Sequence, residues 1–106
     1  MVSPIKQEHW LDENGNPAGG SSFGCGFAIS WQNGPLNRGA KRKEPNGAFV
    51  ENIIKAAIGR LEHYQTTKFA CKENADALAN LQRALACCNA RTANREARQV
   101  EGTHQE

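Results

Sequence analysis

The chain has 106 residues, of which 39% are hydrophobic, so it can form one small domain with a modest core. Its 13 basic and 11 acidic residues give a net charge of +2, which does not indicate a nucleic-acid-binding protein. No apolar run approaches the roughly 18 residues of a membrane span and no leader sequence is recognisable, so we expect a cytosolic protein with no membrane partner.

The cysteines and histidines show no pattern typical of a metal site. The four cysteines, Cys25, Cys71, Cys87 and Cys88, form no C-x-x-C pair, and the three histidines have no ligand spacing. Cys87 and Cys88 are neighbours on a predicted helix and point ~100° apart, which disfavours a bridge between them. We therefore predict reduced, partly buried thiols, with no metal and no cofactor.

The N-terminal 44 residues predict turns and strands. Residues 1–22 are rich in glycine and turn-forming residues, which indicates a flexible arm with one short strand around Trp10. The stretch FGCGFAISW, residues 23–31, alternates large and small side chains and predicts one strand. Asn33-Gly34 indicates a hairpin turn, with a second strand at 36–40, so that 23–44 forms a β-hairpin region. A phosphate loop at Gly24-x-Gly26 is disfavoured, because the third glycine and the following helix are missing.

Two helices are predicted after Pro45. Residues 46–66 form the first, with Asn46 as N-cap and a buried apolar stripe of period three and four, made by Val50, Ile53, Ile54, Ala57, Leu61 and Tyr64. Residues 73–100 form the second, with a seam of Ala75, Leu78, Leu81, Leu85, Cys88 and Thr92. Gly102 stops it and leaves a tail at 101–106. One α+β domain is predicted, in which a small antiparallel sheet packs on an antiparallel two-helix hairpin.

Arginines gather near the C-terminal end of the second helix. Arg91, Arg95 and Arg98 lie within ~60° of one another on a helical wheel. Guanidinium groups match phosphate oxygens, so this stripe is a candidate anion site. The alternative is a soluble helix end that suits the helix dipole and is partly neutralised by Glu96 and Glu101.

A second candidate group lies at the opposite end of the predicted hairpin. Tyr64, Phe69 and Asn74 offer aromatic faces and an amide, which can stack on a nucleobase and bond to its edge. Alternatively, Tyr64 only completes the core stripe and Asn74 only caps its helix. Asn74 and Arg91 are ~25 Å apart along one helix, so a shared small ligand requires two chains packed antiparallel about a twofold axis.

No catalytic constellation is apparent, which favours a binding protein over an enzyme. The alternatives are a small nucleic-acid-binding or regulatory protein that places the arginine stripe on phosphates, a structural helical module, and a hydrolase of cyclic nucleotides. Binding that falls steeply with salt and ignores small nucleotides would indicate the first of these.

Three stretches carry a family resemblance: QNGP (32–35), RLEHYQTTKFACKENADAL (60–78) and RTANREARQVEGT (91–103). They resemble the first type of Thoeris anti-defence protein, a phage family of sponges for cyclic ADP-ribose signals. The resemblance implies dimers, with hexamers as a further assembly, in the cytoplasm of the infected host. It implies that glycocyclic ADP-ribose made by TIR-domain enzymes is held without cleavage, so that the downstream effector stays inactive. The resemblance further implies cyclic di- and trinucleotides as ligands, at the same or additional sites.

The resemblance also implies roles for individual residues. The ring of Tyr64 matches the base-stacking aromatic, Asn74 matches a ligand-contacting asparagine, and Arg91 matches a phosphate-binding arginine. Arg95 extends this set along the helical stripe, and Arg38 is a candidate for the family's arginine nearer the N-terminus. The Gly-rich arm and Lys41-Arg42-Lys43 depart from the family pattern.

Overall fold

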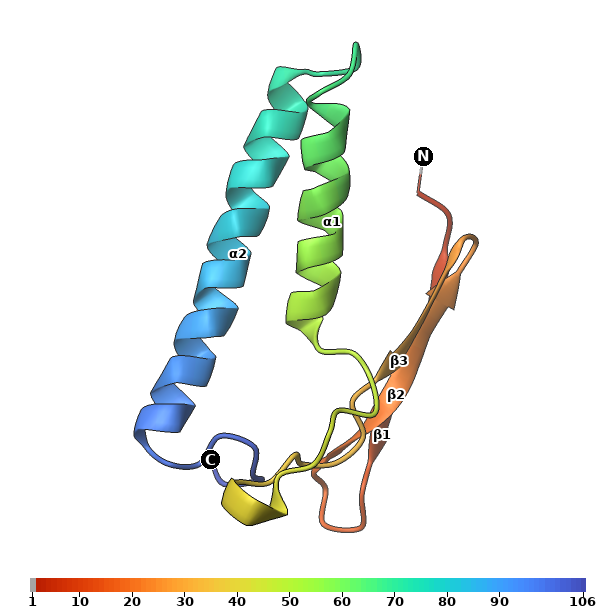
Figure 1. Cartoon of the computed structure of the whole chain (residues 1–106). Coiled ribbons are helices and arrows are strands. Elements are labelled where there is room, and N and C mark those ends of the chain that lie inside the picture. The colour runs from red at the N-terminus through yellow and green to blue at the C-terminus, as the bar shows by residue number, and fades with distance from the viewer. Residues whose placement is uncertain (1) are drawn as a thin grey trace. The chain divides into compact units, whose positions relative to one another are not determined.

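The computed structural model describes residues 2–106 and has the predicted α+β composition (Figure 1). Three antiparallel strands in the order β1-β2-β3 come first along the chain, and two helices follow. The elements are β1 (Ile5–Leu11), β2 (Pro17–Gly24), β3 (Phe27–Trp31), the short 3-10 helix η1 (Gly39–Lys41), α1 (Val50–Tyr64) and α2 (Lys72–Ala97).

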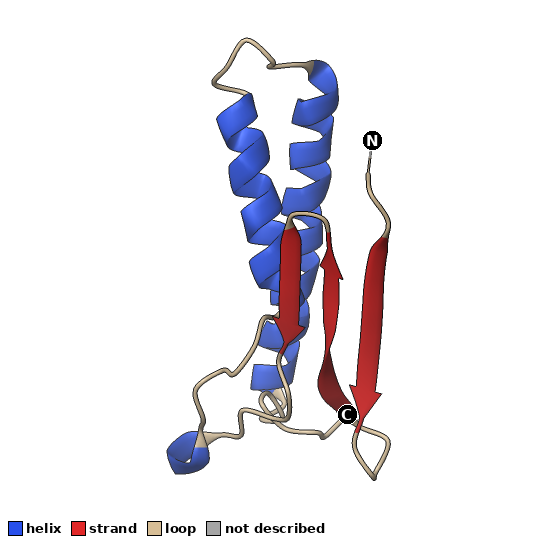
Figure 2. Ribbon diagram, turned by 90° about the vertical axis from the view of Figure 1, so that its right-hand side faces the viewer, coloured by secondary structure: helices blue, strands red, loops and turns tan. Residues whose placement is uncertain are grey.

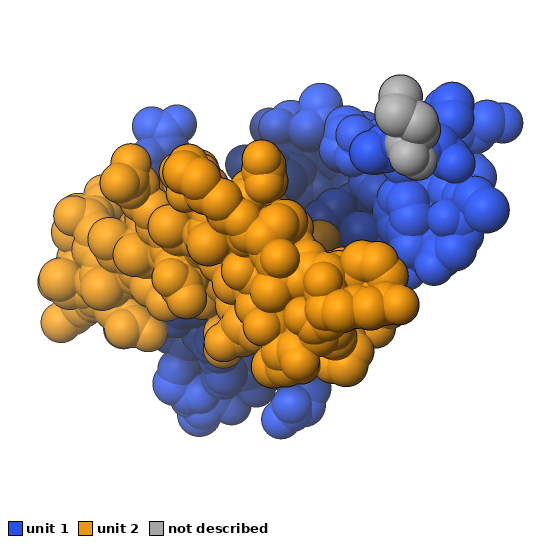
Figure 3. Space-filling model, turned by 90° about the horizontal axis from the view of Figure 1, so that it is seen from above, with its two compact units in different colours: residues 1–49, 100–106 blue, residues 50–99 orange. Residues whose placement is uncertain are grey.

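The chain divides into two compact units, coloured separately in Figure 3. Met1–Phe49 and Val100–Glu106 make the first unit, which holds the sheet and η1. Val50–Gln99 makes the second unit, the helical hairpin. The hairpin is therefore an insertion in the first unit, to which the chain connects it once before Val50 and once after Gln99. The assignment of the whole chain to one domain stays a prediction.

The predicted N-terminal arm is wrong, because residues 1–22 contain β1 and most of β2 (Figure 2). The strand expected around Trp10 is confirmed as part of β1. Of the turn-forming residues that suggested an arm, Pro17 and residues 19–22 lie in β2, whereas Asp12, Asn14 and Gly15 form the connection between β1 and β2. There, Oδ1 of Asp12 accepts hydrogen bonds from the N–H groups of Asn14 and Asn16, both at 2.9 Å. This Asp-based turn joins β1 to β2, which explains how so polar a stretch forms a β-hairpin.

The Asp12 turn predicts a local pH response. The backbone hydrogen bond from Asn16, and with it that from Asn14, holds the pKa of the Asp12 carboxyl below its usual value. Since the pKa is lowered by folding, the turn is stabilised above the ordinary Asp pKa and loses this support as pH falls through the lowered value. Titration followed by NMR should show the Asn14 and Asn16 amide shifts moving together, below the ordinary Asp range. Asp12→Asn should abolish that movement, and amide shifts that titrate unchanged in this variant would contradict the assignment.

The single strand predicted over 23–31 is instead the end of β2, a tight turn and β3. The chain reverses at Cys25-Gly26, where Gly26 has a φ of 89°, so that Gly24 pairs with Phe27. Of the two glycines in this stretch, Gly24 ends β2, and Gly26 forms the turn. The second strand predicted at 36–40 is also wrong. Asn33-Gly34 leads into a loop and η1, because Pro35 follows at once and no strand pairs there.

Hydrogen bonds between side chains link all three strands through Ser22. Ser22 is only 2% exposed, although it lies on a polar strand. Its Oγ donates to Oε1 of Gln7 in β1 at 2.7 Å and accepts from Nε1 of Trp31 in β3 at 2.8 Å. A buried hydroxyl that both donates and accepts a hydrogen bond stabilises the sheet and fixes its register.

The C-terminal residues close the first unit. The N–H of Asn37 donates to the carbonyl of Gly102 at 2.6 Å, and Leu36 beside it is 7% exposed. A Cβ on Gly102, whose φ is 81°, would lie 2.5 Å from the carbonyl oxygen of Asn37. Gly102 is therefore needed for this close approach. It does not stop α2, because the helix ends at Ala97 and Gln99 adopts the left-handed conformation, with a φ of 60°.

Both predicted helices are confirmed, although their ends differ from the prediction. α1 begins four residues after Asn46, so Asn46 is not its N-cap; its Oδ1 accepts the N–H of Asn33 at 2.9 Å instead. The predicted seam of α2 is half-buried along Leu78, Leu81, Leu85, Cys88 and Thr92, whereas Ala75 is exposed.

The apolar stripe of α1 is not buried as predicted. Neither helix has a buried residue within the described chain, and Val50 and Ile53 are 50% and 37% exposed. Each helix of a two-helix hairpin contacts only one other helix, so one side of its stripe stays uncovered. The chain therefore presents apolar helix surface that a further helix could cover.

Candidate ligand-binding site

The tip of the hairpin, residues 64–74, is fixed by local hydrogen bonds. The side-chain amide of Gln65 pairs with the backbone of Cys71 in both directions, with Nε2 donating at 3.0 Å and Oε1 accepting at 3.1 Å. Thr67 donates both its N–H and its Oγ1 hydroxyl to the carbonyl of Tyr64, at 3.0 and 2.6 Å. These bonds satisfy the last carbonyl of α1 and hold the two helix ends together.

Asn74 is not a helix cap. The N-cap of α2 is Cys71, which makes no side-chain capping bond, and Asn74 is the third residue of the helix. Asn74 is half-buried, and its amide forms no hydrogen bond to any other residue of 2–106. The capping alternative is therefore excluded, and the amide is available to a ligand.

Two aromatic rings at the tip each lie near a cation. The guanidinium carbon of Arg60 lies 4.9 Å from the centre of the half-buried Tyr64 ring. Phe69 is 66% exposed, and Nζ of Lys68 lies 5.3 Å from the centre of its ring. A base stacked on Tyr64 must use the face away from Arg60 or displace it. Sequence reasoning missed Arg60, although its spacing of four from Tyr64 on one helix could have indicated the contact.

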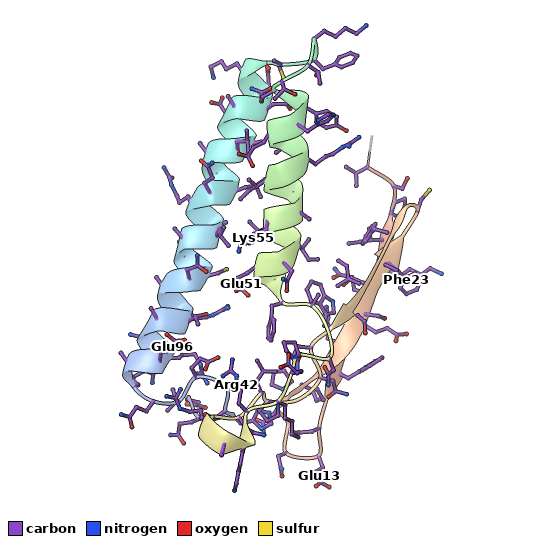
Figure 4. The ribbon with its side chains drawn as sticks, in the orientation of Figure 1. Glu13, Phe23, Arg42, Glu51, Lys55 and Glu96 are labelled. Carbon is purple, nitrogen blue, oxygen red and sulfur yellow. The ribbon has the colours of Figure 1, made fainter. Side chains whose placement is uncertain are left out.

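At the opposite end of the hairpin, Arg91 connects the two helices. Its Nη2 lies 2.6 Å from Oε1 of Glu51, which Figure 4 labels on the first turn of α1. The Arg91 side chain is 58% exposed and that of Glu51 is 21% exposed. The predicted neutralising residue Glu96 is not the partner in this pair. Because the pair is largely solvated, it stabilises the hairpin only modestly and leaves most of the guanidinium accessible.

The three arginines of the stripe lie in different surroundings. Arg95 is half-buried on the seam side of α2 and Arg91 is exposed. Arg98 is the C-cap, and its Nε donates to Oδ1 of Asn94 at 3.0 Å. Arg91 and Arg95 remain the stronger candidates for an anion, while Arg98 has a clear role in ending the helix.

The candidate residues form two groups within the second unit. Tyr64, Phe69 and Asn74 are at the tip, and Arg91 and Arg95 are at the open end. α2 is continuous from Lys72 to Ala97, so Asn74 and Arg91 are ~25 Å apart along it. One hairpin therefore does not bring both groups to the same small ligand.

Arg38 belongs to the first unit and is already engaged. Its Nη1 donates to the carbonyl of Glu101 at 3.1 Å and lies 3.8 Å from the carboxylate of that residue. The same carboxylate is 2.6 Å from Nη1 of Arg42, labelled in Figure 4. Glu101 was predicted to neutralise part of the stripe on α2, and its carboxylate also neutralises Arg38 and Arg42. The Lys41-Arg42-Lys43 cluster is thus partly compensated by the C-terminal tail.

The remaining reactive groups add no further site. Cys25, Cys71 and Cys87 are free and exposed, whereas partly buried thiols were predicted; Cys88 is free and half-buried. Within residues 2–106, no three His, Cys, Asp or Glu side chains gather as a metal site would require. The helices in that range are too short or too polar to cross a bilayer.

Comparison with known proteins identifies the class of this hairpin. Residues 27–93, which include β3 and nearly all of both helices, match the family model described as Acb2/Tad1, hairpin domain. The match covers more than half of the chain, which therefore belongs to the Acb2/Tad1 hairpin domain family. Tyr64, Phe69, Asn74, Arg91 and Arg38 all lie within the matched range.

A particular relative is the protein named Thoeris anti-defense 1 from Bacillus phage SBSphiJ7. The two chains are 42% identical over 77 residues, which is 73% of this chain and 51% of the relative. The chain thus spans about half the length of the curated relative it matches. The predicted resemblance to the Thoeris anti-defence family is confirmed.

Proposed function

We propose that this chain counteracts Thoeris defence by binding a cyclic nucleotide immune signal, glycocyclic ADP-ribose, and sequestering it without cleavage. The effector that awaits this signal in the infected cell would then stay inactive. The observation that carries the proposal is the 42% identity to Thoeris anti-defense 1 over 77 residues. Cyclic di- and trinucleotides are further candidate ligands of the same chemical class.

The two groups of candidate residues match the two parts of such a ligand. Tyr64 and Phe69 offer ring faces for adenine, and the unbonded amide of Asn74 offers a donor and an acceptor for its edge. Arg91 and Arg95 offer charge-assisted hydrogen bonds to the diphosphate, and Arg38 is a further candidate for this role. The role proposed for these residues is binding alone, in which the ligand is held without being turned over.

A second copy of the chain would complete each site. The ~25 Å between Asn74 and Arg91 exceeds the reach of a small nucleotide, whereas antiparallel packing about a twofold axis joins the tip of one hairpin to the open end of the other. The exposed Val50 and Ile53 supply apolar surface for such packing. We propose a dimer as the binding unit, with hexamers as a further assembly.

A ligand panel tests the proposed function. The purified protein should gain thermal stability with glycocyclic ADP-ribose or another adenine-containing cyclic nucleotide, because a ligand at 100 times its Kd stabilises the folded state by ~2.7 kcal/mol. Heating the complex should release the ligand chemically intact. An unchanged Tm with every cyclic nucleotide would contradict the proposal, and a cleaved product would indicate a hydrolase. Stabilisation by duplex DNA alone, lost at high salt, would indicate the nucleic-acid-binding alternative.

Glu51→Gln separates the structural and ligand-binding roles of Arg91. Losing this solvated ion pair should cost at most about 1 kcal/mol of hairpin stability. Ligand affinity should be retained or increased, since the guanidinium no longer shares its charge with Glu51. Arg91→Ala should have a similar stability cost but lose ligand affinity. Urea unfolding and calorimetric titration of both variants measure the two effects, and equal affinity losses would mean that Arg91 acts only through Glu51.

A further inference from the structure

β1 lies at the edge of the sheet with one side unpaired. The strand order is β1-β2-β3, and all seven residues of β1 are exposed. Residues 5–9 pair with β2 in unbroken register, and the only irregularity falls between His9 and Leu11. This stretch contains no proline, so its outer N–H and C=O groups can accept another strand.

The side chains of this edge have unused bonding capacity. Lys6 and Glu8 lie on one face of the strand, opposite Phe23 and Ser21 of β2, and neither forms an ion pair within residues 2–106. Gln7 lies on the other face. Its Oε1 accepts from Ser22, while its Nε2 has no hydrogen-bond partner among the described residues.

One antiparallel arrangement of two β1 strands gives a bonding partner to each of the three side chains, Lys6, Gln7 and Glu8. A twofold axis through Gln7 places Lys6 opposite Glu8 of the second copy, Glu8 opposite Lys6 of the second copy, and the two Gln7 residues opposite each other. Directly opposed Cβ atoms lie about 4.5–5.5 Å apart, which is within ion-pair and amide hydrogen-bond range. An axis through Lys6 or Glu8 would instead place like charges in opposition.

We propose that β1 pairs antiparallel with β1 of a second copy, centred on Gln7, and joins two sheets into one continuous sheet. The partner is a second copy because the charge sequence Lys-Gln-Glu is complementary to itself only in this antiparallel register. This interface involves the first unit alone and does not depend on ligand binding.

Cysteine cross-linking tests the register. In a chain with all four native cysteines replaced by serine, Gln7→Cys should form a disulfide-linked dimer under mild oxidation, because its two copies lie opposite each other. Lys6→Cys or Glu8→Cys alone should not form a disulfide, since each cysteine lies two positions along the strand from the same cysteine of the second copy. A mixture of the Lys6→Cys and Glu8→Cys chains should cross-link to each other, and peptide mass spectrometry identifies the bonded positions.

Charge reversal tests the same interface without new cysteines. Lys6→Glu and Glu8→Lys each create two like-charge pairs and should weaken the strand-paired species roughly tenfold, as measured by sedimentation equilibrium. Mixing the two variants, or combining both changes in one chain, should restore association. Circular dichroism checks that each variant is folded.

Folded Gln7→Cys that stays unlinked, cross-linking of Lys6→Cys as fast as Gln7→Cys, or failure of the two charge variants to complement each other would each overturn the proposal. The ligand panel described above would be unaffected by these outcomes. Conversely, a protein that ignores every cyclic nucleotide could still cross-link through Gln7.

Discussion

Gly20→Ala is expected to disrupt the sheet more than any other glycine-to-alanine change in the first unit. Gly20 is buried in β2 between His9 of β1 and Trp31 of β3, with a φ of 145°. A Cβ at this position would overlap the carbonyl oxygen of Glu8, which is backbone and has no rotamer with which to move aside. Backbone strain plus this overlap should cost more than about 3 kcal/mol of the free energy of unfolding.

Gly26→Ala is the matched control for this substitution. Gly26 also has a positive φ, of 89°, but a Cβ there meets no atom within 4 Å. Alanine should therefore cost only the conformational strain, about 1–2 kcal/mol. Hydrogen exchange of the amides of residues 17–24 measures both variants. A Gly20→Ala chain with the same amide protection as Gly26→Ala would contradict the close packing of β1 on β2.

Tyr64→Ala and Arg91→Ala are each expected to weaken ligand binding severely, and their mixture to recover it in part. Loss of base stacking costs about 1–3 kcal/mol, and loss of a charge-assisted hydrogen bond costs about 1.5–3 kcal/mol. Either change should therefore raise Kd by roughly tenfold to a hundredfold. If each site takes its tip from one chain and its arginines from the other, a mixed dimer has one intact site. An equal mixture should then regain about a quarter of the sites at parental affinity.

Tyr64→Ala mixed with Asn74→Ala provides the control. Both residues lie at the same tip, so neither site of a mixed dimer is intact and no recovery is expected. Calorimetric titration counts the restored sites, and native mass spectrometry verifies that subunits have exchanged. Recovery in the control mixture, or none in the Tyr64→Ala and Arg91→Ala mixture despite exchange, would contradict sites shared between two chains.

The helices could be predicted because their signal is local. Apolar residues at spacings of three and four place α1 and α2 within a few residues of their observed ends. The strands were harder, since PAGGSSFG in β2 has small and polar residues of low strand propensity. β2 is instead stabilised by pairing on both sides and by the Ser22 hydrogen bonds, which depend on residues that are distant in sequence.

In the candidate site, too, the features set by local sequence could be predicted, and the contacts between residues distant in sequence could not. The ring of Tyr64 and the amide of Asn74 could be assigned to one end of the hairpin from helix length alone. The ion pairs Arg91–Glu51 and Arg42–Glu101 join residues 40 and 59 positions apart, and no sequence period indicates them. The predicted acidic partner of the stripe, Glu96, is close to it in sequence, whereas the observed partner of Arg91, Glu51, is distant and was not predicted.

Trp31, which donates the hydrogen bond to Ser22, makes the intrinsic fluorescence of the protein a signal of the state of the sheet. Both tryptophans of the chain, Trp10 and Trp31, lie in strands of the first unit, whereas the helical hairpin has none. Indole emission therefore follows the loss of the sheet, while ellipticity at helix-sensitive wavelengths follows mainly the hairpin. Superimposed melting curves would show that the two units unfold as one cooperative system, and separated curves would give the stability of each without any added dye.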